Sequence, residues 1–583
     1  MSVLILAWWH SLLPSIGPAT YSYDGHEDRR ADLPVDVATA GHHLHVRFDM
    51  RVGALHPTLF SVRPDDRLDS LTVDGQPVHI GKQPCFPDGG TVSLAGALHR
   101  GDNAVDMQIE DSGGRGGVGF AVSIVDPLFV GIVCFVGLLA MVLVAYVLRT
   151  IGAGRLAVPV IATIVVALAV RLPLITEPGY AFDTGLDAHW AKSAVVLGIG
   201  PSYLHQIDDT PLPNYPPLQM AVFAGTGRAY RALLSPNYDL SVRDCIAFMK
   251  LPGVLADVAA AVVLLFLARR ISVVRCAPWI AGLGYAVQPG VLYESAVWGQ
   301  VDSIFALGVL GALIAALSKR WFVMGALLSV ALLTKFQAVV ALPAIVAVCV
   351  AERRITRPLL GALSATLPAL ALLRSWPVMA AAKDVYTHSS GFFPVLSMYA
   401  YNVWVALYGL GSRQHTDADT FLGPLTYRHV GLAVFAVIAI AAAVIGARRL
   451  RKATTLADRA WILFAVPAVT VYAFFLFNTE MHERYLFLLL PLGIPVVLTG
   501  PGLRPYLAAS LLFFINVIGV LPWTPLDRAA FKEFPNLPGL IGVCNVLVFV
   551  AMFRLFVRGR AQPLKQPPRP RIESDTVTGL ASR

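Results

Sequence analysis

Long apolar runs follow one another from residue 127 almost to the end of the chain, separated by short polar segments. About 20 consecutive apolar residues are enough to cross a bilayer as a helix. The pattern therefore predicts a multi-pass α-helical membrane protein with about eleven spans and one re-entrant hairpin. The expected spans cover residues 127–148, 156–175, 251–268, 277–294, 301–317, 359–373, 427–445, 461–477, 486–498, 506–521 and 540–556.

Two apolar segments do not fit a single straight span. Residues 321–350 are too long for one, and both flanks are basic. We expect a hairpin of two short helices broken near Lys335, because irregular backbone is tolerated at membrane depth where protein or water surrounds it. Residues 217–234 carry Arg228 and Arg231. That segment is more typical of an interfacial or re-entrant helix.

The first 126 residues follow a different pattern. Residues 1–16 are apolar but short and lack a basic flank, so we expect at most a degenerate signal or anchor. Residues 17–126 predict an all-β domain of jelly-roll type. Apolar positions alternate over residues 42–52, 105–109 and 118–124, and an Asp74-Gly75 turn predicts a hairpin. The layout loosely resembles jelly-roll carbohydrate-binding modules, and both sugar binding and a purely structural role stay open.

The composition agrees with a membrane protein, and the distribution of charge predicts which segments lie on each side of the membrane. Hydrophobic residues make up 56% of the chain and charged residues 14%, against roughly 25% charged in soluble domains. Much of the net charge of +9 lies in clusters beside the spans, which indicates membrane orientation rather than nucleic-acid binding. We expect a cell-membrane location, an extracytoplasmic β-domain and a disordered cytoplasmic tail at residues 558–583. The six scattered cysteines argue against a zinc site and a disulfide framework.

Four polar constellations fall on the expected outer face, at residues 183–218, 298–303, 386–402 and 480–485. They come from distant parts of the chain, and helix packing can gather them into one cleft. Lys335, in the broken hairpin, lies within possible reach. Membrane proteins have little reason to keep Trp, His and carboxylates together in loops without function.

Asp183 and Asp187 are the candidate catalytic residues. They are four apart, so they share one face if the segment is helical. A carboxylate beside hydrocarbon is partly desolvated, and its basicity can rise to that of a general base. The alternative is that both are solvated loop acids or helix caps. For Asp302 we favour capping of the helix that begins at Ser303.

His482, Glu483 and Arg484 place a base, an acid and a cation at one expected helix start. Arg484 can bind a phosphate through two hydrogen bonds, although a local ion pair with Glu483 is an equal alternative. Lys335 is costly to bury without an anion, and either a phosphate or Asp257 would satisfy it. For Asp257 itself we favour a structural link between helices.

Several aromatic residues lie in the same segments. Tyr215 precedes two prolines that fix the direction of the backbone, so we expect it to shape its loop. The other rings can stack on sugars, although an interfacial belt is the simpler expectation. These rings are Trp190, Trp298, Tyr399, Tyr401 and Trp404.

At these residues the chain resembles GT-C fold glycosyltransferases that use polyprenyl-phosphate sugars, above all the dolichyl-phosphate-glucose glucosyltransferases and their bacterial relatives. The likeness covers about residues 156–557. The chain differs from the family in having the β-domain, and in having Gly185 where the eukaryotic motif has Glu. The matching positions, in order, are Asp183, His189-Trp190, residues 215–218, residues 250–257, residues 298–302, residues 335–337 and residues 482–484.

The resemblance implies an inverting transfer of a hexose from a polyprenyl monophosphate to a glycan, lipid or protein hydroxyl. Asp183 would be the base, while Arg484, Lys335 and His482 would stabilise the leaving phosphate. No cofactor is implied. A divalent metal, as in the oligosaccharyltransferase branch, stays open through Asp183 with Asp187 or Asp302. The candidate substrate-binding residues are His189, Trp190, Tyr215, Trp298, Gln300, Asp302, Lys335, Gln337, His482, Glu483 and Arg484.

Two other classes of function compete with an enzyme. The many spans, the broken helix and buried Asp257 are also typical of a transporter or flippase of lipid-linked sugars. The sequence shows no internal repeat, however, and its richest polar cluster lies at one face. A cell-surface sugar-binding anchor would leave the polar loops unexplained. The sugar and the acceptor are not indicated.

Overall fold

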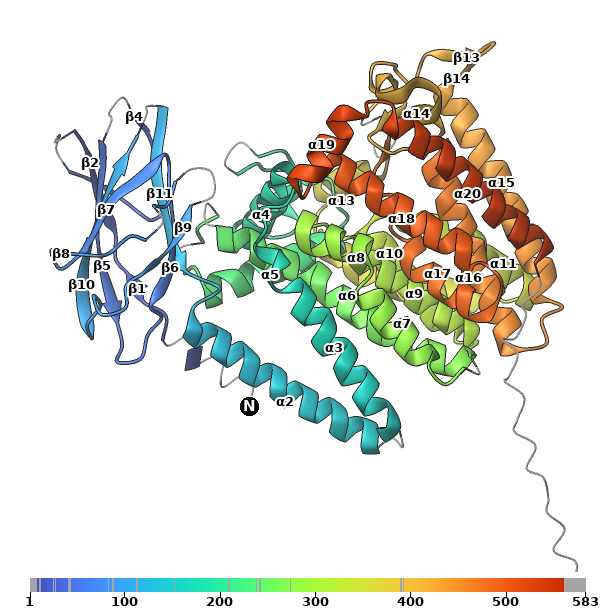
Figure 1. The fold of residues 1–583 in the computed structure, drawn as a ribbon, viewed down its shortest axis with the longest axis horizontal. Helices are drawn as coiled ribbons and strands as arrows, with labels where there is room; N and C mark the ends of the chain where they lie inside the picture. The colour runs from blue at the N-terminus through green and yellow to red at the C-terminus, as the bar shows by residue number, and fades with distance from the viewer. Residues whose placement is uncertain are drawn as a thin grey trace, which may run out of the picture.

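The computed structural model describes residues 8–559, apart from residues 10–11, 25, 27, 40–42, 82, 86–88, 112–113, 151–152, 208–209, 237, 241–242, 273, 388–390 and 392. An N-terminal β region lies beside a larger helical part, and the chain is 62% helical (Figure 1). Most of the apolar segment 1–16, the predicted tail from residue 560 onward, and the acidic pair 208–209 lie outside the described residues.

The β region consists of two sheets that pack face to face. One has the strand order β3-β2-β5-β10-β7-β8, with β1 paired to β5, and the other has the order β4-β11-β6-β9. Phe48 of β5 contacts Phe120 of β11 across the two sheets, with ring centroids 5.2 Å apart. The strands are β1 (Ser15–Ile16), β2 (Ala19–Tyr23), β3 (Arg29–Ala31), β4 (Val35–Thr39), β5 (His43–Val52), β6 (Leu59–Pro64), β7 (Arg67–Val73), β8 (Gln76–Pro77), β9 (Gly90–Ser93), β10 (Gly101–Glu110) and β11 (Gly114–Val122).

Strand signals in the sequence match this region well. In β5 the alternate residues from Leu44 to Val52 are buried, as the period of two predicts. Asp74 and Gly75 both have positive φ angles, 51° and 75°, and join β7 to β8. Two such residues make the type I′ turn that fits a two-residue hairpin. The predicted hairpin is confirmed, and the last strand ends at Val122 rather than at residue 124.

Buried hydrogen bonds fix the β region to the helical part. Asp244, at the start of α6 (Arg243–Ile271), is buried and accepts from the Ser61 hydroxyl at 2.7 Å and the Ile124 amide at 2.8 Å. The Val122 amide also donates to the carbonyl of Leu234, just after α5 (Pro217–Leu233), at 3.1 Å. The β region is therefore docked on the helices rather than tethered by a free linker.

Seven helical segments among the described residues are long and apolar enough to cross a membrane. Burial separates them: 89% of the apolar window of α16 is buried, against 6% for α2, so α16 is central and α2 peripheral. The helices other than α5 and α6 are α2 (Pro127–Thr150), α3 (Ala157–Arg171), α4 (Ala181–Val196), α7 (Ala277–Ala286), α8 (Pro289–Leu292), α9 (Asp302–Leu317), α10 (Trp321–Thr334), α11 (Leu342–Glu352), α12 (Thr356–Ala371), α13 (Trp376–Thr387), α14 (Val403–Tyr408), α15 (Tyr427–Leu450), α16 (Leu456–Phe477), α17 (Leu489–Thr499), α18 (Leu503–Val520), α19 (Pro525–Glu533) and α20 (Leu537–Arg558).

The remaining apolar segments form shorter or broken helices. The segment expected to span residues 277–294 divides into α7, α8 and a π-helical turn, η4 (Tyr293–Trp298). The predicted break at Lys335 is confirmed: α10 ends at Thr334, Lys335 is extended (φ −150°, ψ 132°), and a 3₁₀ helix, η5 (Phe336–Ala341), follows. The amphipathic helix α19, with its Thr524–Asp527 capping box, was not predicted.

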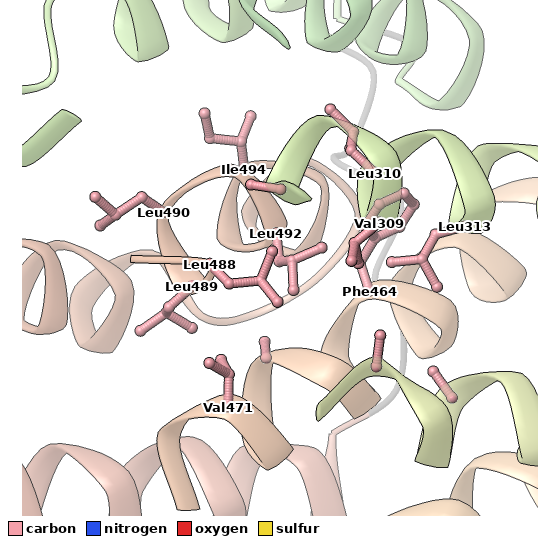
Figure 2. Packing of buried hydrophobic residues seen from close by; sticks show 14 of the residues in the cluster. Val309, Leu310, Leu313, Phe464, Val471, Leu488, Leu489, Leu490, Leu492 and Ile494 are labelled. Atoms are coloured by element: carbon pink, nitrogen blue, oxygen red, sulfur yellow. The ribbon is translucent and has the colours of Figure 1, made fainter. Parts of the chain in front are cut away.

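The core of the helical part lies around α16. Side chains from α9, α16 and α17 interdigitate there (Figure 2). The chain leads from this apolar layer to the polar constellations, since α9 begins at Asp302 and α17 follows Arg484 by only a few residues. The labelled residues are Val309, Leu310, Leu313, Phe464, Val471, Leu488, Leu489, Leu490, Leu492 and Ile494.

Replacing Asp244 should loosen the docking of the β region. Asp244→Ala removes the acceptor of two buried donors, and each donor left unpaired costs roughly 1–3 kcal/mol. We expect a clearly lower melting temperature in detergent. Asp102→Ala is the control, because its ion pair with Arg51 is exposed. Equal melting temperatures of the two variants would contradict the docking role.

Candidate functional site

Segments far apart in the chain bring their polar side chains into one cluster. Asp183 comes from α4, Gln300 from the turn after η4, Lys335 from the helix break, and Arg484 from just after β15 (Met481–His482). Contacts between these residues, given below, confirm that helix packing gathers them. The constellation at residues 386–402 joins through β12 (Ser397–Met398), which pairs with β15. We call this group the Asp183 cluster; its members are Asp183, Asp187, Trp298, Gln300, Asp302, Lys335, His482, Glu483 and Arg484.

Asp183 is held by two neutral donors and faces one cation. Its Oδ2 accepts from Gln300 Nε2 at 2.6 Å and from Trp298 Nε1 at 3.1 Å. Arg484 Nη1 lies 3.5 Å from the same oxygen. Among the described residues no donor bonds to Oδ1, and the side chain keeps 19% of its surface exposed. Asp183 is therefore oriented through one oxygen and accessible through the other.

A strained turn aims the two donors at Asp183. Gly299 has φ +95°, and a Cβ there would come within 2.7 Å of a Thr184 methyl carbon. The Gly299 and Gln300 amides both donate to the carbonyl of Glu294, at 3.0 and 2.9 Å. Lys250, buried inside α6, donates to the carbonyl of Val297 at 2.9 Å. Only glycine fits the turn, and buried hydrogen bonds hold its shape.

Arg484 has hydrogen-bonding capacity to spare. Its Nη1 donates to Glu483 Oε1 at 2.7 Å, so the predicted local ion pair is present, and Glu483 is buried. The buried Nε of Arg484 has no acceptor among the described residues. Buried donors are nearly always paired, so an unpaired one on a cation marks a place where an anion can bind.

His482 is neutral in this setting. Burial, together with the charges of Arg484 and Lys335, holds its pKa well below the usual histidine range. The ring packs edge-on against Phe393, with centroids 5.3 Å apart. His482 can therefore donate or accept one hydrogen bond but does not supply a positive charge. The Tyr485 ring also packs on His482, with centroids 5.1 Å apart, and the predicted companion Gln337 lies in η5, two residues after Lys335.

Asp187 differs from Asp183 despite lying one turn later on the same helix. It is buried, and burial followed by the charge of Asp183 raises its pKa well above the usual range. The charges of Lys335 and Arg484 act in the opposite direction but do not offset the burial. A carboxyl group that keeps its proton is a poor base, so the two candidate acids have different chemistry.

Lys335 is paired with Asp302, and two expectations from the sequence are wrong here. Both side chains are buried, and Lys335 Nζ contacts Asp302 Oδ1. Asp302 does not cap α9, whose N-cap is Val301 with no side-chain hydrogen bond. Lys335 does not pair with Asp257. Asp302 pairs with Lys335 rather than capping the helix, because leaving the buried lysine charge unpaired would be costly.

Asp257 belongs to a separate, structural network. It accepts from Tyr285 at 3.0 Å and from Ser303 at 2.6 Å, and it lies 3.4 Å from Arg171 Nε. Arg171 also donates to the carbonyl of Ala286 at 2.7 Å. These contacts join α3, α6, α7 and α9. The favoured structural role of Asp257 agrees with this geometry.

The aromatic residues are mostly buried, so the belt interpretation is wrong for Trp190, Trp298, Tyr401 and Trp404. Trp190 Nε1 donates to the carbonyl of Pro211 at 2.7 Å and so holds the loop before α5. Tyr215 packs edge-on against the Trp190 ring, and Lys335 Nζ lies 5.8 Å from the Tyr215 centroid. Trp190 and Trp298 thus act through their indole N–H groups.

His189 lines a small neighbouring cavity, which Trp190, His205 and Gln206 also line. Its Nδ1 lies 2.8 Å from the Gly185 carbonyl, so Nδ1 donates and Nε2 is left as an acceptor. No contact described here joins His189 to Asp183. The cavity lies beside the cluster, on the same helix α4.

Sequence analysis missed two residues that shape the cluster, Lys250 and Glu294. Both are charged residue types in apolar segments, a signal that was available. Their contacts are with the backbone: Lys250 donates to the carbonyls of Ala296 and Val297, and the Glu294 carbonyl accepts from Gly299 and Gln300. No sequence periodicity identifies such contacts. Lys250 was noted only as part of a motif, and Glu294 only as the end of an expected span.

No protein-family model matches the chain, and no curated protein matches it. The chemistry of the site therefore rests on its own geometry. The Asp183 cluster combines an accessible carboxylate, an arginine with an unpaired donor, a second cation and a neutral histidine. Such a set can take a proton from a hydroxyl and bind an anion next to it.

Breaking the Lys335–Asp302 pair should destabilise the protein. Lys335→Met leaves Asp302 buried without its cation, which costs about 3–5 kcal/mol. Adding Asp302→Asn to this variant should restore much of the loss, because the buried charge is gone. Thermal unfolding in detergent measures both. A double variant no more stable than Lys335→Met would contradict the pairing.

The stability of the protein should fall on acidification partly through His482. The unfolded chain binds a proton on His482 more tightly than the folded chain does. The stability gained from a neutral His482 is therefore complete above the ordinary histidine pKa of about 6.5, and it is lost as the pH falls below that value. His482→Gln should reduce the loss between about pH 8 and pH 5 by up to about 1.4 kcal/mol per pH unit. The exposed His26→Gln is the control; equal slopes for both variants would contradict a buried neutral His482.

Proposed function

We propose that this chain is an inverting membrane glycosyltransferase of GT-C type, which moves a hexose from a polyprenyl monophosphate to an acceptor hydroxyl. The observation that carries the proposal is the setting of Asp183. Its carboxylate is oriented by Trp298 and Gln300 and lies 3.5 Å from Arg484. A base and an anion site side by side are what such a transfer needs.

In the proposed reaction, Asp183 Oδ1 takes the proton of the acceptor hydroxyl. The acceptor oxygen then forms a bond to the anomeric carbon, and the bond from that carbon to the phosphate oxygen breaks. The lipid phosphate leaves with the electron pair. Because attack and departure occur on opposite faces, the anomeric configuration inverts.

Arg484 and Lys335 are the groups proposed to stabilise the leaving phosphate. Arg484 has its unpaired Nε for this task, and Lys335 keeps further N–H donors beyond its bond to Asp302. His482, being neutral, is proposed to donate one hydrogen bond. Negative charge develops on the phosphate during the transfer, so these donors act most strongly in the transition state.

The proposal places the Asp183 cluster and the β region on the extracytoplasmic side of the cell membrane and the C-terminal tail in the cytoplasm. The support is the position of basic residues at the opposite helix ends, such as Arg149 in the last turn of α2 and Arg448 and Arg449 in the last turn of α15. Shorter helices such as α9 and α17 would complete about eleven crossings and the hairpin.

A divalent cation does not fit the donor set around Asp183. Asp302 is already paired with Lys335, and Arg484 faces Asp183. The positive charges of Lys335 and Arg484 would repel a divalent cation bound here. We therefore propose a transfer without a metal.

A flippase of lipid-linked sugars is the second candidate, favoured by the helix break at Lys335. The buried Arg171–Asp257 pair, which a transporter could use, is instead bonded to neighbouring helices on several sides. Transfer and flipping are distinguished by whether a new glycosidic bond forms.

Asp183→Asn should abolish most transfer while the protein still folds. Asparagine keeps the shape but cannot take a proton, so we expect a loss of about 10²–10⁴-fold in kcat. The measurement is release of polyprenyl phosphate from a panel of polyprenyl-phosphate sugars, with and without EDTA. Asp187→Asn should lose far less, because burial raises the pKa of this carboxyl group and Asp187 is not the proposed base.

The exposed variant Asp102→Asn in the β region is the control for the preparation. Full activity of Asp183→Asn would contradict Asp183 as the base. Sensitivity to EDTA would contradict the metal-free transfer. If the wild type moves labelled lipid across liposomes without forming a glycosidic bond, the flippase is correct.

A further inference from the structure

Glu294 is a buried carboxyl group that the proposed reaction does not yet use. It lies in the π-helical turn η4 and is 1% exposed. Neither of its side-chain oxygens receives a hydrogen bond from a described donor. Isolated π-helical turns are frequent at functional sites, and an unpaired buried carboxylate is among the costliest groups in a protein.

The turn brings Glu294 close to the start of α9, because its backbone carbonyl accepts from the Gln300 amide, two residues before Asp302. With no described donor at either side-chain oxygen, an ionised Glu294 would be an unpaired buried charge, which is too costly to persist. Asp302 is the partner of the Lys335 ammonium group, which favours its ionised form. The proton therefore belongs on Glu294.

We propose that Glu294 is a proton-carrying positioning residue. It donates a hydrogen bond to Asp302, and Asp302, held in this way, fixes Lys335 so that its remaining donors face the phosphate of the sugar donor. The role of the phosphate rests on the function proposed above. The proton on Glu294 does not, since it follows from the burial of the carboxyl group and the absence of a described donor to it.

The charged groups around Glu294 come from several elements. Asp302 at the start of α9 and Lys335 at the helix break act on it directly, and Asp257 of α6 adds a further negative charge. Tyr285 of α7 points to Asp257 instead, at 3.0 Å. An ionised Glu294 would compete with Asp302 for the Lys335 ammonium group and draw it away from the site.

Glu294 also connects the two halves of the Asp183 cluster. Its backbone carbonyl accepts from Gly299 and Gln300 and so fixes the turn that orients Asp183. Its side chain, through Asp302, fixes Lys335. The base and the second cation are thus positioned by one residue.

The proton can be tested without any substrate. The infrared difference spectrum of purified wild type minus Glu294→Gln, at neutral pH, should contain the C=O band of a protonated carboxyl group. Loss of carboxylate bands alone would overturn the proposal. This result stands even if the wild type transfers no sugar, so a failure of the proposed function and a failure of this inference are distinguishable.

The positioning role is tested by two variants of similar size. Glu294→Gln keeps a neutral donor and should retain transfer close to that of wild type. Glu294→Leu removes the donor and should lose about tenfold or more, since misplaced groups cost that much. If Glu294→Gln is impaired as much as Glu294→Leu, the hydrogen bond to Asp302 does not position Lys335. Melting temperatures verify folding, and the infrared result decides the protonation even if Glu294→Leu does not fold.

Discussion

The chain must bury ionised groups inside an apolar scaffold, and the way it pairs them shapes the structure. An isolated buried charge is too costly to persist, so each needs a partner or a proton. Arg171 and Asp257 are bonded to neighbouring helices on several sides and hold the bundle together. Among the described residues, Arg484 Nε and both carboxyl oxygens of Glu294 have no hydrogen-bond partner, and neither has Arg171 Nη2. Exposure separates the site from the scaffold: the side chains of Asp183 and Arg484 are partly exposed, whereas those of Arg171 and Asp257 are fully buried and cannot meet a ligand.

The turn after η4 shows how the scaffold supports the site. Lys250 and the Glu294 carbonyl hold the backbone there, and Gly299 allows it to reverse sharply. As a result Trp298 and Gln300 reach Asp183 on a different helix. Because these two donors and their acceptor are already held in place, they need not rearrange when charge develops in the transition state. Such preorganisation is the condition for electrostatic catalysis.

Features with a local signal could be predicted from the sequence. The alternation of β5, the Asp74-Gly75 turn and the break at Lys335 each follow from residues that are neighbours in the chain. Asp183 was identified as the central acid, and its convergence with Arg484 was anticipated from the sides of the membrane on which the loops were expected to lie.

The partners of buried groups could not be predicted, because they depend on packing between distant helices. Asp302 was expected to cap a helix and instead pairs with Lys335. Trp190 was expected at the membrane surface and is buried. Asp183 and Asp187 look alike in the sequence, and only their burial and neighbours separate an accessible carboxylate from a protonated one. Short amphipathic helices such as α19 lack the long apolar run on which the prediction of spans depends.

The central claim is that one carboxylate, Asp183, activates the acceptor for direct displacement of the lipid phosphate. The anomeric configuration of the product tests it most directly. Purified protein would be given a polyprenyl-phosphate β-hexose, and the linkage formed would be determined by NMR. The account predicts an α-linked product. A β-linked product would contradict it, because a single direct displacement at the anomeric carbon inverts its configuration.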